Sequence, residues 1–557
     1  MYILGISCYY HESAATLIED GKIIAASAEE RFSRIKHDSA FPEQAIAYCL
    51  KEAGIGAEQL SYVVFYEKPV VKFERMLSFA VSEFPFSLSQ FVYGMRNSLS
   101  RNLWIHSGIL KKLGIRPDQI LFVPHHLCHA AASFYPSPFT KAAYVTLDGV
   151  GEWSTGSWGI AKGSRLYPNK ELRFPHSVGL LYSAFTAYLG FEVNEGEFKV
   201  MGMAAYGKPI HTKRISRVYK QYADGSIVLD ESYFSFQRSS TRMFTHKFEQ
   251  LFADCTTVDL AASIQAVIEE IILTMLRAIQ KETGEKNLVY GGGVALNSVV
   301  NGCITKKTGF TNIYIFPAAG DDGASAGAAL YVYHHVLGNS QRGELTHVFL
   351  GYKPKIKDIE QTLSNVRLHK VRMRSSQVVR TIARELSKGK IVGWYEGRAE
   401  FGPRALGHRS IIADPRRADM KDIVNASIKF REEFRPFAPV VLSRFMRAFF
   451  GKVDAHLSPY MLATYNATRK AKKLAPAIVH DDGTSRIQCV DVKTYNGTYA
   501  ALLEAFYKKT GVPILLNTSF NLKGEPIVNS PPDALSTFLR SEMDILVLEN
   551  FVVTKYI

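Results

Sequence analysis

Three histidines stand close together in VPHHLCHAAASFYPSPF, the stretch from 123 to 139. His125 and His129 are four residues apart, so on a helix they share one face and could hold one metal ion. Imidazole nitrogens suit borderline transition metals such as iron or zinc. Histidines at this spacing are also common in helix caps and packed cores, and the pair alone favours that simpler interpretation. A metal would need further ligands from elsewhere in the chain.

Two aspartates are the candidate partners of these histidines. Asp148 follows an expected strand at 142–147 and opens the loop DGVGEWSTG, and Asp321 stands in AGDDGASAGAA just before an expected helix. Carboxylate oxygens would complete a mixed nitrogen and oxygen ligand set. Aspartate beside glycine is equally typical of a turn or a helix N-cap. The residues alone leave both interpretations open.

A glycine-rich stretch, YGGGVALN from Tyr290 to Asn297, follows an expected strand and opens an expected helix. Gly291 to Gly293 carry no side chains, so the backbone can approach a nucleotide closely, and a helix N-terminus favours anions. The stretch matches neither GxGxxG nor GxxxxGKS, so a tight structural turn explains it equally well.

The positive charge of the chain is concentrated in its last third. The net charge is +15, and residues 351–557 hold 34 Lys and Arg against 20 Asp and Glu, a net of +14. Such an asymmetry indicates a part that handles anions such as phosphates, nucleotides or nucleic acid. Charge by itself still favours the simpler alternative, a solvated basic face.

Basic side chains of this region are gathered in two motifs, EGRAEFGPRALGHRSIIADPRR (396–417) and IKFREEFRPFAP (428–439). Within them lie Arg398, Arg404, Arg409, Lys429, Arg431 and Arg435. A solvated helix face would pair them with acidic residues four positions away, and the first motif does not. Guanidinium groups on a loop shaped by glycine and proline suit bidentate phosphate binding, so we favour a phosphate site.

Length and composition are those of a globular protein with about two to four domains. The chain has 557 residues, of which 47% are hydrophobic and 21% charged. No apolar run is long enough to span a bilayer, and the N-terminus lacks the features of a signal peptide. The six cysteines are scattered without CxxC or a disulfide-like spacing, so we expect a reduced, cytoplasmic protein.

Strand and helix signals alternate along most of the chain. The start is expected to form paired strands with a turn at 19–21, whereas 42–121 are expected to be mostly helical. A helical stripe over 264–279 has Asp259 as its expected N-cap and Gly284 as its stop. This alternation predicts an α/β protein.

A polar segment with weak periodicity separates two parts of different character. We therefore expect a first domain at 1–345, a linker at 346–370 and a smaller, basic α/β domain at 371–557. The first part has a β-hairpin start, a strand ending in Asp-Gly, a strand ending in three glycines and a Gly-Asp-Asp-Gly loop. This order resembles the actin/sugar-kinase plan, in which loops from two similar halves enclose ATP.

Five motifs together resemble one family, the O-carbamoyltransferases, which includes the nodulation-factor, cephalosporin and tobramycin carbamoyltransferases. The motifs are GISCYYHESAA with EERFSRIKH, HHLCHAAASFYPSPF, TLDGVGEW, FGPRALGHRSI and LNTSFNLKGEPIV. The resemblance spans essentially the whole chain. It implies a two-lobed first domain similar to the universal tRNA-threonylcarbamoylation ATPase and a YrdC-like second domain that makes carbamoyl-adenylate.

The resemblance also implies a metal centre. The family's metal ligands fall on His125, His129, Asp148 and Asp321. The ion is expected to be iron(II), and the same ligand types would suit Mn²⁺ or Zn²⁺. His126 has no such role in the family.

Further roles are implied for residues around substrates. His11 falls on the proposed general base for the acceptor hydroxyl, and Lys36 falls on a residue that contacts the carbamoyl-adenylate. The adenylate pocket of the first domain falls on Lys36, Asp148, Gly179, Gly293 and Asn297. The carbamoyl phosphate and ATP site of the second domain falls on Arg404, Lys429, Arg435, Arg486 and Asn517.

The implied reaction has two halves. Carbamoyl phosphate and ATP, with Mg²⁺, give carbamoyl-adenylate and pyrophosphate in the basic domain, and the adenylate then moves to the first domain. There the metal acts as a Lewis acid while His11 takes the proton of a hydroxyl on a sugar or secondary-metabolite acceptor. No nucleic-acid or membrane partner is expected, and a homodimer is compatible with the sequence.

Two other functions remain as alternatives. A tRNA-threonylcarbamoylating enzyme would use a basic half for RNA, but this chain carries both activating and transferring parts and no separate RNA-binding module. A nucleotide-dependent ATPase without carbamoyl transfer would need neither the metal histidines nor carbamoyl phosphate.

Overall fold

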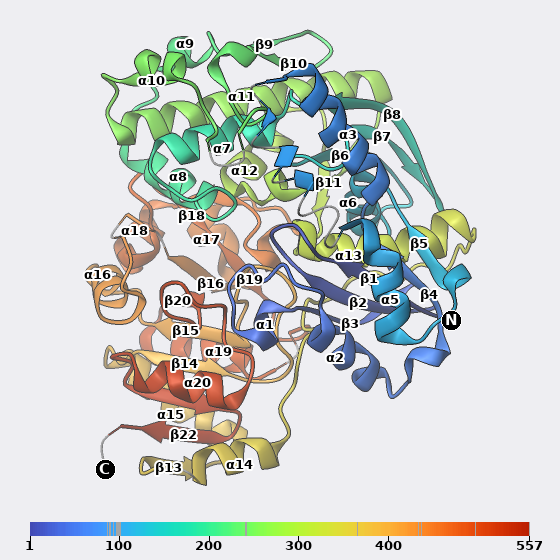
Figure 1. Cartoon of the computed structure of the whole chain (residues 1–557). Coiled ribbons are helices and arrows are strands. Elements are labelled where there is room, and N and C mark those ends of the chain that lie inside the picture. The colour runs from blue at the N-terminus through green and yellow to red at the C-terminus, as the bar shows by residue number, and fades with distance from the viewer. Residues whose placement is uncertain are drawn as a thin grey trace. The chain divides into compact units, whose positions relative to one another are not determined.

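The chain folds into two compact units in the computed structural model (Figure 1). The structure describes residues 1–555 except 86, 89–90, 93, 96–101, 240–241, 365, 433, 436 and 496. The first unit comprises Met1–Glu29 and Asp38–Thr346, and the second comprises Glu30–His37 and His347–Ile557. The segment expected as a linker belongs to the second unit and carries α14 (Ile356–Ser364).

The first unit contains two five-stranded sheets of the same topology. One has the order β3-β2-β1-β4-β5 and the other β8-β7-β6-β11-β12. In each, three antiparallel strands are followed by two parallel strands. The strands are β1 (Tyr2–Ser7), β2 (Ala14–Glu19), β3 (Lys22–Ala28), β4 (Leu60–Phe65), β5 (Ile120–Phe122), β6 (Lys141–Leu147), β7 (Ser154–Lys162), β8 (Arg165–Arg173), β11 (Asn287–Gly291) and β12 (Asn312–Ile315). This duplication confirms the predicted plan of two similar actin/sugar-kinase-like halves.

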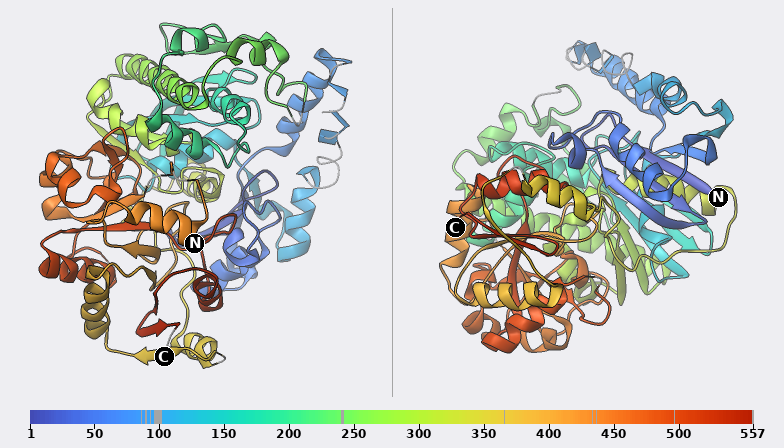
Figure 2. Two further views of the ribbon diagram at one scale, coloured as in Figure 1. Left: turned by 90° about the vertical axis from the view of Figure 1, so that its left-hand side faces the viewer. Right: turned by 90° about the horizontal axis from the view of Figure 1, so that it is seen from below.

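Two central helices pack between the two sheets of the first unit. Helix α13 (Asp321–Tyr331) packs against β1 and β2, whereas α6 (His125–Phe134) packs against β6 and β11, and the two helices pack against each other (Figures 1 and 2). The other helices of this unit are α2 (Glu43–Ala53), α3 (Pro69–Ser82), α5 (Ile105–Leu113), α7 (Val178–Tyr188), α8 (Glu197–Met203), α9 (Thr212–Ile215), α10 (His246–Phe252), α11 (Thr257–Thr283) and α12 (Ser298–Lys307). A small β9 (Tyr219–Gln221) and β10 (Ile227–Leu229) hairpin accompanies them.

One local prediction was wrong for an identifiable reason. Helix α11 is capped by Thr256, whose hydroxyl accepts from the Asp259 amide, so Asp259 lies in the first turn rather than at the cap. Gly284 ends the helix in a left-handed conformation, as predicted. The described part of residues 42–121 is mostly helical, as expected, and it also contains the short parallel strand β4.

The second unit is an α/β structure around one eight-stranded mixed sheet, and this confirms the predicted class. The sheet order is β13-β22-β21-β14-β15-β20-β16-β19. Its strands are β13 (His369–Arg372), β14 (Val392–Tyr395), β15 (Arg409–Ala413), β16 (Ala438–Leu442), β19 (Gln488–Val490), β20 (Ile514–Ser519), β21 (Ile545–Leu548) and β22 (Phe551–Thr554), with β17 (Thr464–Asn466) and β18 (Thr484–Arg486) as a separate pair. The remaining helices are α1 (Glu30–Ser33), α15 (Ser375–Ser387), α16 (Met420–Val424), α17 (Met446–Phe450), α18 (Arg469–Leu474), α19 (Tyr499–Thr510) and α20 (Pro531–Leu539).

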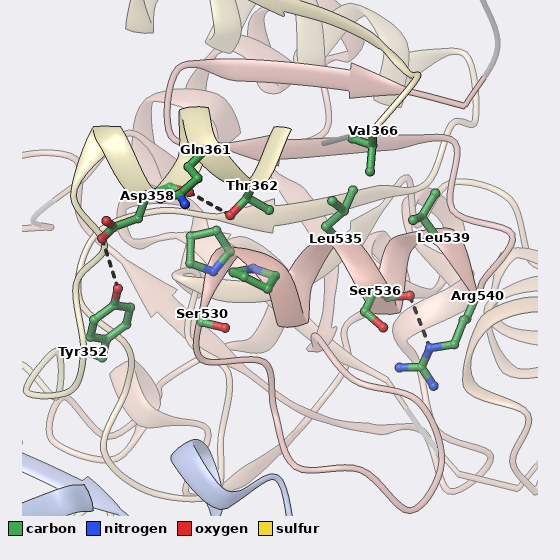
Figure 3. A pocket seen from close by; sticks show the side chains of 12 residues that line it. Tyr352, Asp358, Gln361, Thr362, Val366, Ser530, Leu535, Ser536, Leu539 and Arg540 are labelled. Carbon is green, nitrogen blue, oxygen red and sulfur yellow. Dashed lines mark hydrogen bonds between the residues drawn. The ribbon is translucent and has the colours of Figure 1, made fainter. Parts of the chain in front are cut away.

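An open groove of ≈ 700 Å³ lies on the second unit between α14 and α20 (Figure 3). Tyr352, Leu535 and Arg540 are among the residues that line it. None of the predicted site residues lines this groove. Among the described residues, no helix combines the length and apolarity that a membrane span requires.

Candidate active site

Helix α6 presents its first residue and the residue one turn later to the same point. His125 and His129 are both buried, and their Nε2 atoms lie 3.0 Å apart. The predicted helix is therefore present, and its i, i+4 spacing brings the two imidazoles together.

The two aspartates meet these histidines from different elements. Asp148 directly follows β6, and Asp321 is the first residue of α13. The Asp148 Oδ2 atom lies 3.3 Å from His125 Nε2 and 3.0 Å from His129 Nε2, and Asp321 Oδ1 lies 3.6 and 3.5 Å from the same nitrogens. One ligand atom from each of the four side chains lies within 4.8 Å of all the others. The four residues implied as metal ligands thus form one cluster.

Opposite charges in this cluster stabilise each other. Burial alone would lower the pKa of His129, but hydrogen bonds to Asp148 and Asp321 raise it to about 9. Burial likewise opposes ionisation of Asp148, yet the two histidines hold the pKa of its carboxyl well below the usual range. A buried acidic pair therefore favours positive charge at this point, either on imidazolium groups or on a cation.

The cluster fits a divalent metal ion. Four ligands at about 2.0–2.1 Å around a tetrahedral ion lie about 3.3 Å from one another, close to the spacings of 3.0 to 3.6 Å seen here. The Oδ2 atom of Asp321 is buried without a hydrogen-bond partner among the described residues, which leaves it available to a ligand. Two imidazoles with two carboxylates suit Fe²⁺, Mn²⁺ or Zn²⁺.

Neighbouring groups fix the helix that carries the histidines. The carboxylate of Glu152 accepts from the amides of His125 (3.1 and 3.2 Å) and Lys68 (2.8 Å), so it holds the start of α6. His126 makes other contacts, with Nδ1 2.8 Å from Thr146 Oγ1 and Nε2 2.9 Å from the Ser154 carbonyl. Its side chain stays outside the four-residue cluster.

His11 adjoins the cluster on the side of Asp321. Its Nε2 lies 3.7 Å from Asp321 Oδ2, and its Nδ1 is buried without a hydrogen-bond partner among the described residues. The imidazole is partly exposed, in contrast to the buried His125 and His129. This position suits a group that exchanges a proton with a bound molecule.

Glycines bring backbone close to Asp148. A Cβ on Gly179, in the first turn of α7, would lie 2.5 Å from the Asp148 carbonyl oxygen. A Cβ on Gly293 would lie 3.2 Å from Asp148 Oδ1. Gly292 has φ +86°, and a Cβ there would lie 2.2 Å from the Leu147 carbonyl oxygen. The glycine turn after β11 is therefore required by its conformation and by its contact with the end of β6.

Asn297, which is expected in the adenylate pocket, has a structural role in the fold. Its Oδ1 accepts from the Val300 amide (3.3 Å) and so caps α12. The side-chain amide of Asn297 also exchanges two hydrogen bonds with the side-chain amide of Gln265 on α11, at 3.2 and 3.1 Å. Gln265 is in turn 2.9 Å from the Tyr182 hydroxyl. Gln265 was not predicted, because a single glutamine in an apolar helical stripe carries no signal in the sequence.

Lys36 was expected in the adenylate pocket of the first domain, but it groups with the second unit. It lies in Glu30–His37, which group with the second unit, whereas the metal-binding cluster belongs to the first. Arg34 anchors this segment, donating to the Ile527 and Pro526 carbonyls at 2.7 and 2.9 Å.

A second cluster, the arginine cluster, lies in the second unit. Its members are Arg404, Lys429, Arg431, Arg435 and Arg486. Burial lowers the pKa of Arg486 well below its usual value, and three neighbouring arginines lower it further. Burial and Arg435 also lower the pKa of Arg404 to about 10. Such mutual effects mean that positive charge is concentrated here beyond what nearby carboxylates neutralise.

Several nitrogens of the arginine cluster have no hydrogen bond. The Nε atoms of Arg404 and Arg486 and Nη2 of Arg431 are buried without a partner among the described residues. A carboxylate does lie nearby, since Glu432 Oε2 is 3.8 Å from Arg435 Nη1. Buried guanidinium groups without acceptors are typical of a site that binds an anion.

Lys429 of this cluster and the neighbouring Asn517 already have protein partners. The Lys429 ammonium contacts the carbonyl and hydroxyl oxygens of Ser519 at 2.5 and 3.1 Å, and two oxygens of Asn521 at 3.0 and 2.6 Å. Asn517 donates to Gln488 Oε1 at 2.8 Å and to the Ala405 carbonyl at 3.2 Å, while its Oδ1 is unpartnered among the described residues. Both therefore also hold the loops that surround the arginines.

Two arginines of the same motif serve the fold instead. Arg409 is fully buried, donates to four backbone carbonyls and lies over the Tyr395 ring at 3.6 Å. Arg398 donates to the Leu350 and Gly351 carbonyls at 2.6 and 3.2 Å. The interpretation of the motif as a phosphate site therefore stays a prediction for Arg404, whereas these two arginines bind the backbone of the protein itself.

Comparison with known proteins identifies the family. Residues 2–330 match the family profile described as carbamoyltransferase N-terminus, and residues 383–555 match the one described as carbamoyltransferase C-terminus. The chain belongs to the carbamoyltransferase family. The resemblance found in the motifs is thereby confirmed over nearly the whole chain, and the protein is an enzyme of the transferase class.

Proteins with similar sequences come from different kinds of organism. The chain is 43% identical to the uncharacterized protein sll1178 of Synechocystis sp., covering 100% of this chain and 97% of that protein. It is 36% identical to the nodulation protein NolNO of Sinorhizobium fredii, over 98% of this chain and 79% of that one. Among solved structures, component A of (R)-2-hydroxyglutaryl-CoA dehydratase from Acidaminococcus fermentans covers 60% of this chain and 99% of its own at 17% identity, with a TM-score of 0.36.

Proposed function

We propose that this carbamoyltransferase moves the carbamoyl group of carbamoyl phosphate to a hydroxyl of a small-molecule acceptor, with ATP as co-substrate and carbamoyl-adenylate as the intermediate. The observation that carries the proposal is the presence of two separate constellations in one family member. One is a buried set of two histidines and two aspartates, and the other is a buried arginine cluster. An activation step on polyanions and a transfer step on a hydroxyl need these two kinds of site.

The activation step belongs to the arginine cluster of the second unit. Water releases phosphate from carbamoyl phosphate and leaves carbamate, whose oxygen attacks the α-phosphorus of ATP so that pyrophosphate departs. Arg404, Arg431 and Arg486 each have a buried nitrogen without a partner among the described residues, and these nitrogens would pair with phosphate oxygens. Their charge would stabilise the transition state, in which negative charge accumulates on those oxygens. Mg²⁺ would accompany ATP as its usual counter-ion.

The transfer step belongs to the first unit. His11 takes the proton of the acceptor hydroxyl, the hydroxyl oxygen attacks the carbamoyl carbon, and AMP leaves, which gives a carbamate ester. Asp321, whose Oδ2 atom lies 3.7 Å from His11 Nε2, would orient the imidazole. A divalent metal, with iron(II) as our first choice, would be held by His125, His129, Asp148 and Asp321 and would supply Lewis acidity.

Isotope transfer tests this function. The enzyme is incubated with ATP, [¹³C]carbamoyl phosphate and one of two acceptor pools, a small-molecule extract or total tRNA. The expected result is a ¹³C-labelled carbamate ester in the small-molecule pool, dependent on ATP. Label in tRNA would support the threonylcarbamoylation-type alternative instead, and ATP hydrolysis without labelled product in either pool would contradict carbamoyl transfer.

A further inference from the structure

Arg75 is a buried cation in the first unit that the metal-binding cluster does not use. It lies on α3, its side chain is 9% exposed, and its Nε is buried without a hydrogen-bond partner among the described residues. Its guanidinium lies over the Phe174 ring, 4.9 Å from the centroid, and no described carboxylate lies within ion-pair distance of it. A buried charge without a partner is costly, so such a group usually serves a ligand.

The nearest acidic side chains are already engaged. Glu67 Oε2 pairs with Lys72 at 2.8 Å, and Glu152 accepts from the backbone amides that start α6. The other oxygen of Glu67, Oε1, is buried and has no partner among the described residues. One donor and one acceptor are therefore both unsatisfied in the same region. A ligand that supplies an anionic group and a hydroxyl would satisfy both.

Ring contacts connect the region around Arg75 and Glu67 with His125 of the metal-binding cluster and with His11. Glu67 follows Tyr66, whose ring packs edge-on against His125 with centroids 5.4 Å apart. Lys72 Nζ lies over the Tyr10 ring at 4.9 Å, and that ring is 4.6 Å from the imidazole of His11. Arg75 and Glu67 thus lie on the side of the cluster where His11 would meet the acceptor hydroxyl.

The groups that shift the pKa of Tyr10 also come from both the metal-binding cluster and Arg75. Loss of water raises the pKa of its hydroxyl, Asp321 and Asp148 raise it further, and Arg75 lowers it. The Tyr10 hydroxyl therefore senses the metal-binding cluster and Arg75 together.

We propose that Arg75 and Glu67 form an acceptor subsite for a hydroxy acid such as a sugar acid. Arg75 binds its carboxylate, and Glu67 accepts from one of its other hydroxyls. The subsite rests on the proposed function, because it names the class of acceptor whose hydroxyl would face His11. Lys72 neutralises Glu67, so the net charge of the subsite favours an acid over an amine.

Binding of simple probes tests the subsite without catalysis. Isothermal titration calorimetry of the full chain compares D-glucuronate with D-glucose, which lacks the carboxylate. We expect the wild-type Kd for D-glucuronate to be at least about tenfold lower than for D-glucose. In Arg75→Met the two sugars should bind with equal, weak affinity. The matched control is Arg238→Met, which removes an arginine paired with Glu83 just after α3 and should keep the preference.

Each other outcome counts against the subsite. Equal affinity of the wild type for both sugars, absence of D-glucuronate binding, or an unchanged preference in Arg75→Met would overturn it. If Arg75→Met does not fold, Arg75→Lys replaces it, because lysine keeps the charge but cannot bind a carboxylate through two parallel N–H groups. This variant should weaken D-glucuronate binding by at least about threefold. Carbamoyl-phosphate-dependent pyrophosphate formation by the wild type is measured in parallel. Its absence would overturn the proposed function, while the sugar titrations would still decide the subsite.

Discussion

The Nε2 atoms of His125 and His129 face each other at 3.0 Å, one helical turn apart on α6. Asp148 approaches both of them within 3.3 Å from the end of β6. Two imidazole nitrogens and two carboxylates converge on one buried point. The arrangement is best satisfied by a cation, because every converging atom can donate an electron pair.

Removal of one imidazole should abolish strong metal binding. We expect His129→Ala to weaken Mn²⁺ binding by at least about 100-fold, since even outer-shell changes cost 10–100-fold. His126→Gln is the matched control, because His126 lies on the same helix but contacts Thr146 and Ser154 instead. Calorimetric titration with Mn²⁺ and metal analysis of the purified variants check both. Wild-type affinity in His129→Ala would refute the assigned ligand set.

A methyl group at Gly179 should disturb Asp148. The Cβ of Gly179→Ala would lie 2.5 Å from the Asp148 carbonyl oxygen, so the strand end that carries this carboxylate must shift. We expect a loss of about 1–3 kcal/mol in stability and weaker Mn²⁺ binding. Gly108→Ala is the control, since nothing lies within 4 Å of a Cβ at that helical position. Thermal unfolding and Mn²⁺ titration of both variants give the comparison, and equal behaviour would show that the loop tolerates the shift.

Replacement of a central arginine should abolish phosphate binding without lowering the stability of the ligand-free protein. Arg486→Met removes a buried charge that three neighbouring arginines repel, so we expect the ligand-free variant to be at least as stable as the wild type. Inorganic phosphate should raise the thermal midpoint of the wild type and not that of the variant. Arg444→Met, which breaks an ion pair with Glu504, should keep the phosphate effect. A phosphate-dependent midpoint in Arg486→Met would contradict the assignment.

Acid should destabilise the second unit through His480. Burial lowers the pKa of this imidazole to about 4, with Asp482 opposing the shift and Arg486 adding to it. An unfolded histidine titrates near 6.5, so the unfolded state gains the proton first as pH falls. Stability is therefore full above pH 6.5 and is lost towards pH 4, by about 2 kcal/mol at pH 5.

Replacement of this histidine checks the sign of the pH effect. His480→Gln cannot titrate, so its unfolding midpoint should fall less than that of the wild type between pH 7.5 and pH 5. Urea unfolding at both pH values, followed by tryptophan fluorescence, measures the difference. A parallel fall in the two proteins would show that His480 does not cause it.

Local signals in the sequence predicted the parts of the site that lie within one element. The i, i+4 histidines lie on a helix, Asp148 ends a strand, and the glycine turn follows β11, all as expected. The resemblance to the family singled out both aspartates. Spacing alone could not show that a strand end and the start of α13 meet at α6, because that contact depends on how two sheets of the same topology pack around two helices.

Charged residues were harder to assign from the sequence. Arg404 and Arg409 stand five residues apart in one motif, and each has a buried Nε without a partner among the described residues. The terminal nitrogens of Arg409 nevertheless donate to four backbone carbonyls. Burial and partners decide this difference, and neither can be read from composition. Arg75 was not predicted for the same reason, since one arginine on an amphipathic helix is usually solvated.

We propose that the arginine cluster carries out activation and the metal-binding cluster carries out transfer. This division is tested most directly by measuring the pyrophosphate that is released from ATP in the first turnover. The wild type, His129→Ala and Arg486→Met are each mixed with ATP and Mg²⁺, with and without carbamoyl phosphate, in the absence of acceptor. The wild type and His129→Ala should both release pyrophosphate only with carbamoyl phosphate, and Arg486→Met should release at least about 100-fold less. Release without carbamoyl phosphate, or its loss in His129→Ala with retention in Arg486→Met, would contradict the account.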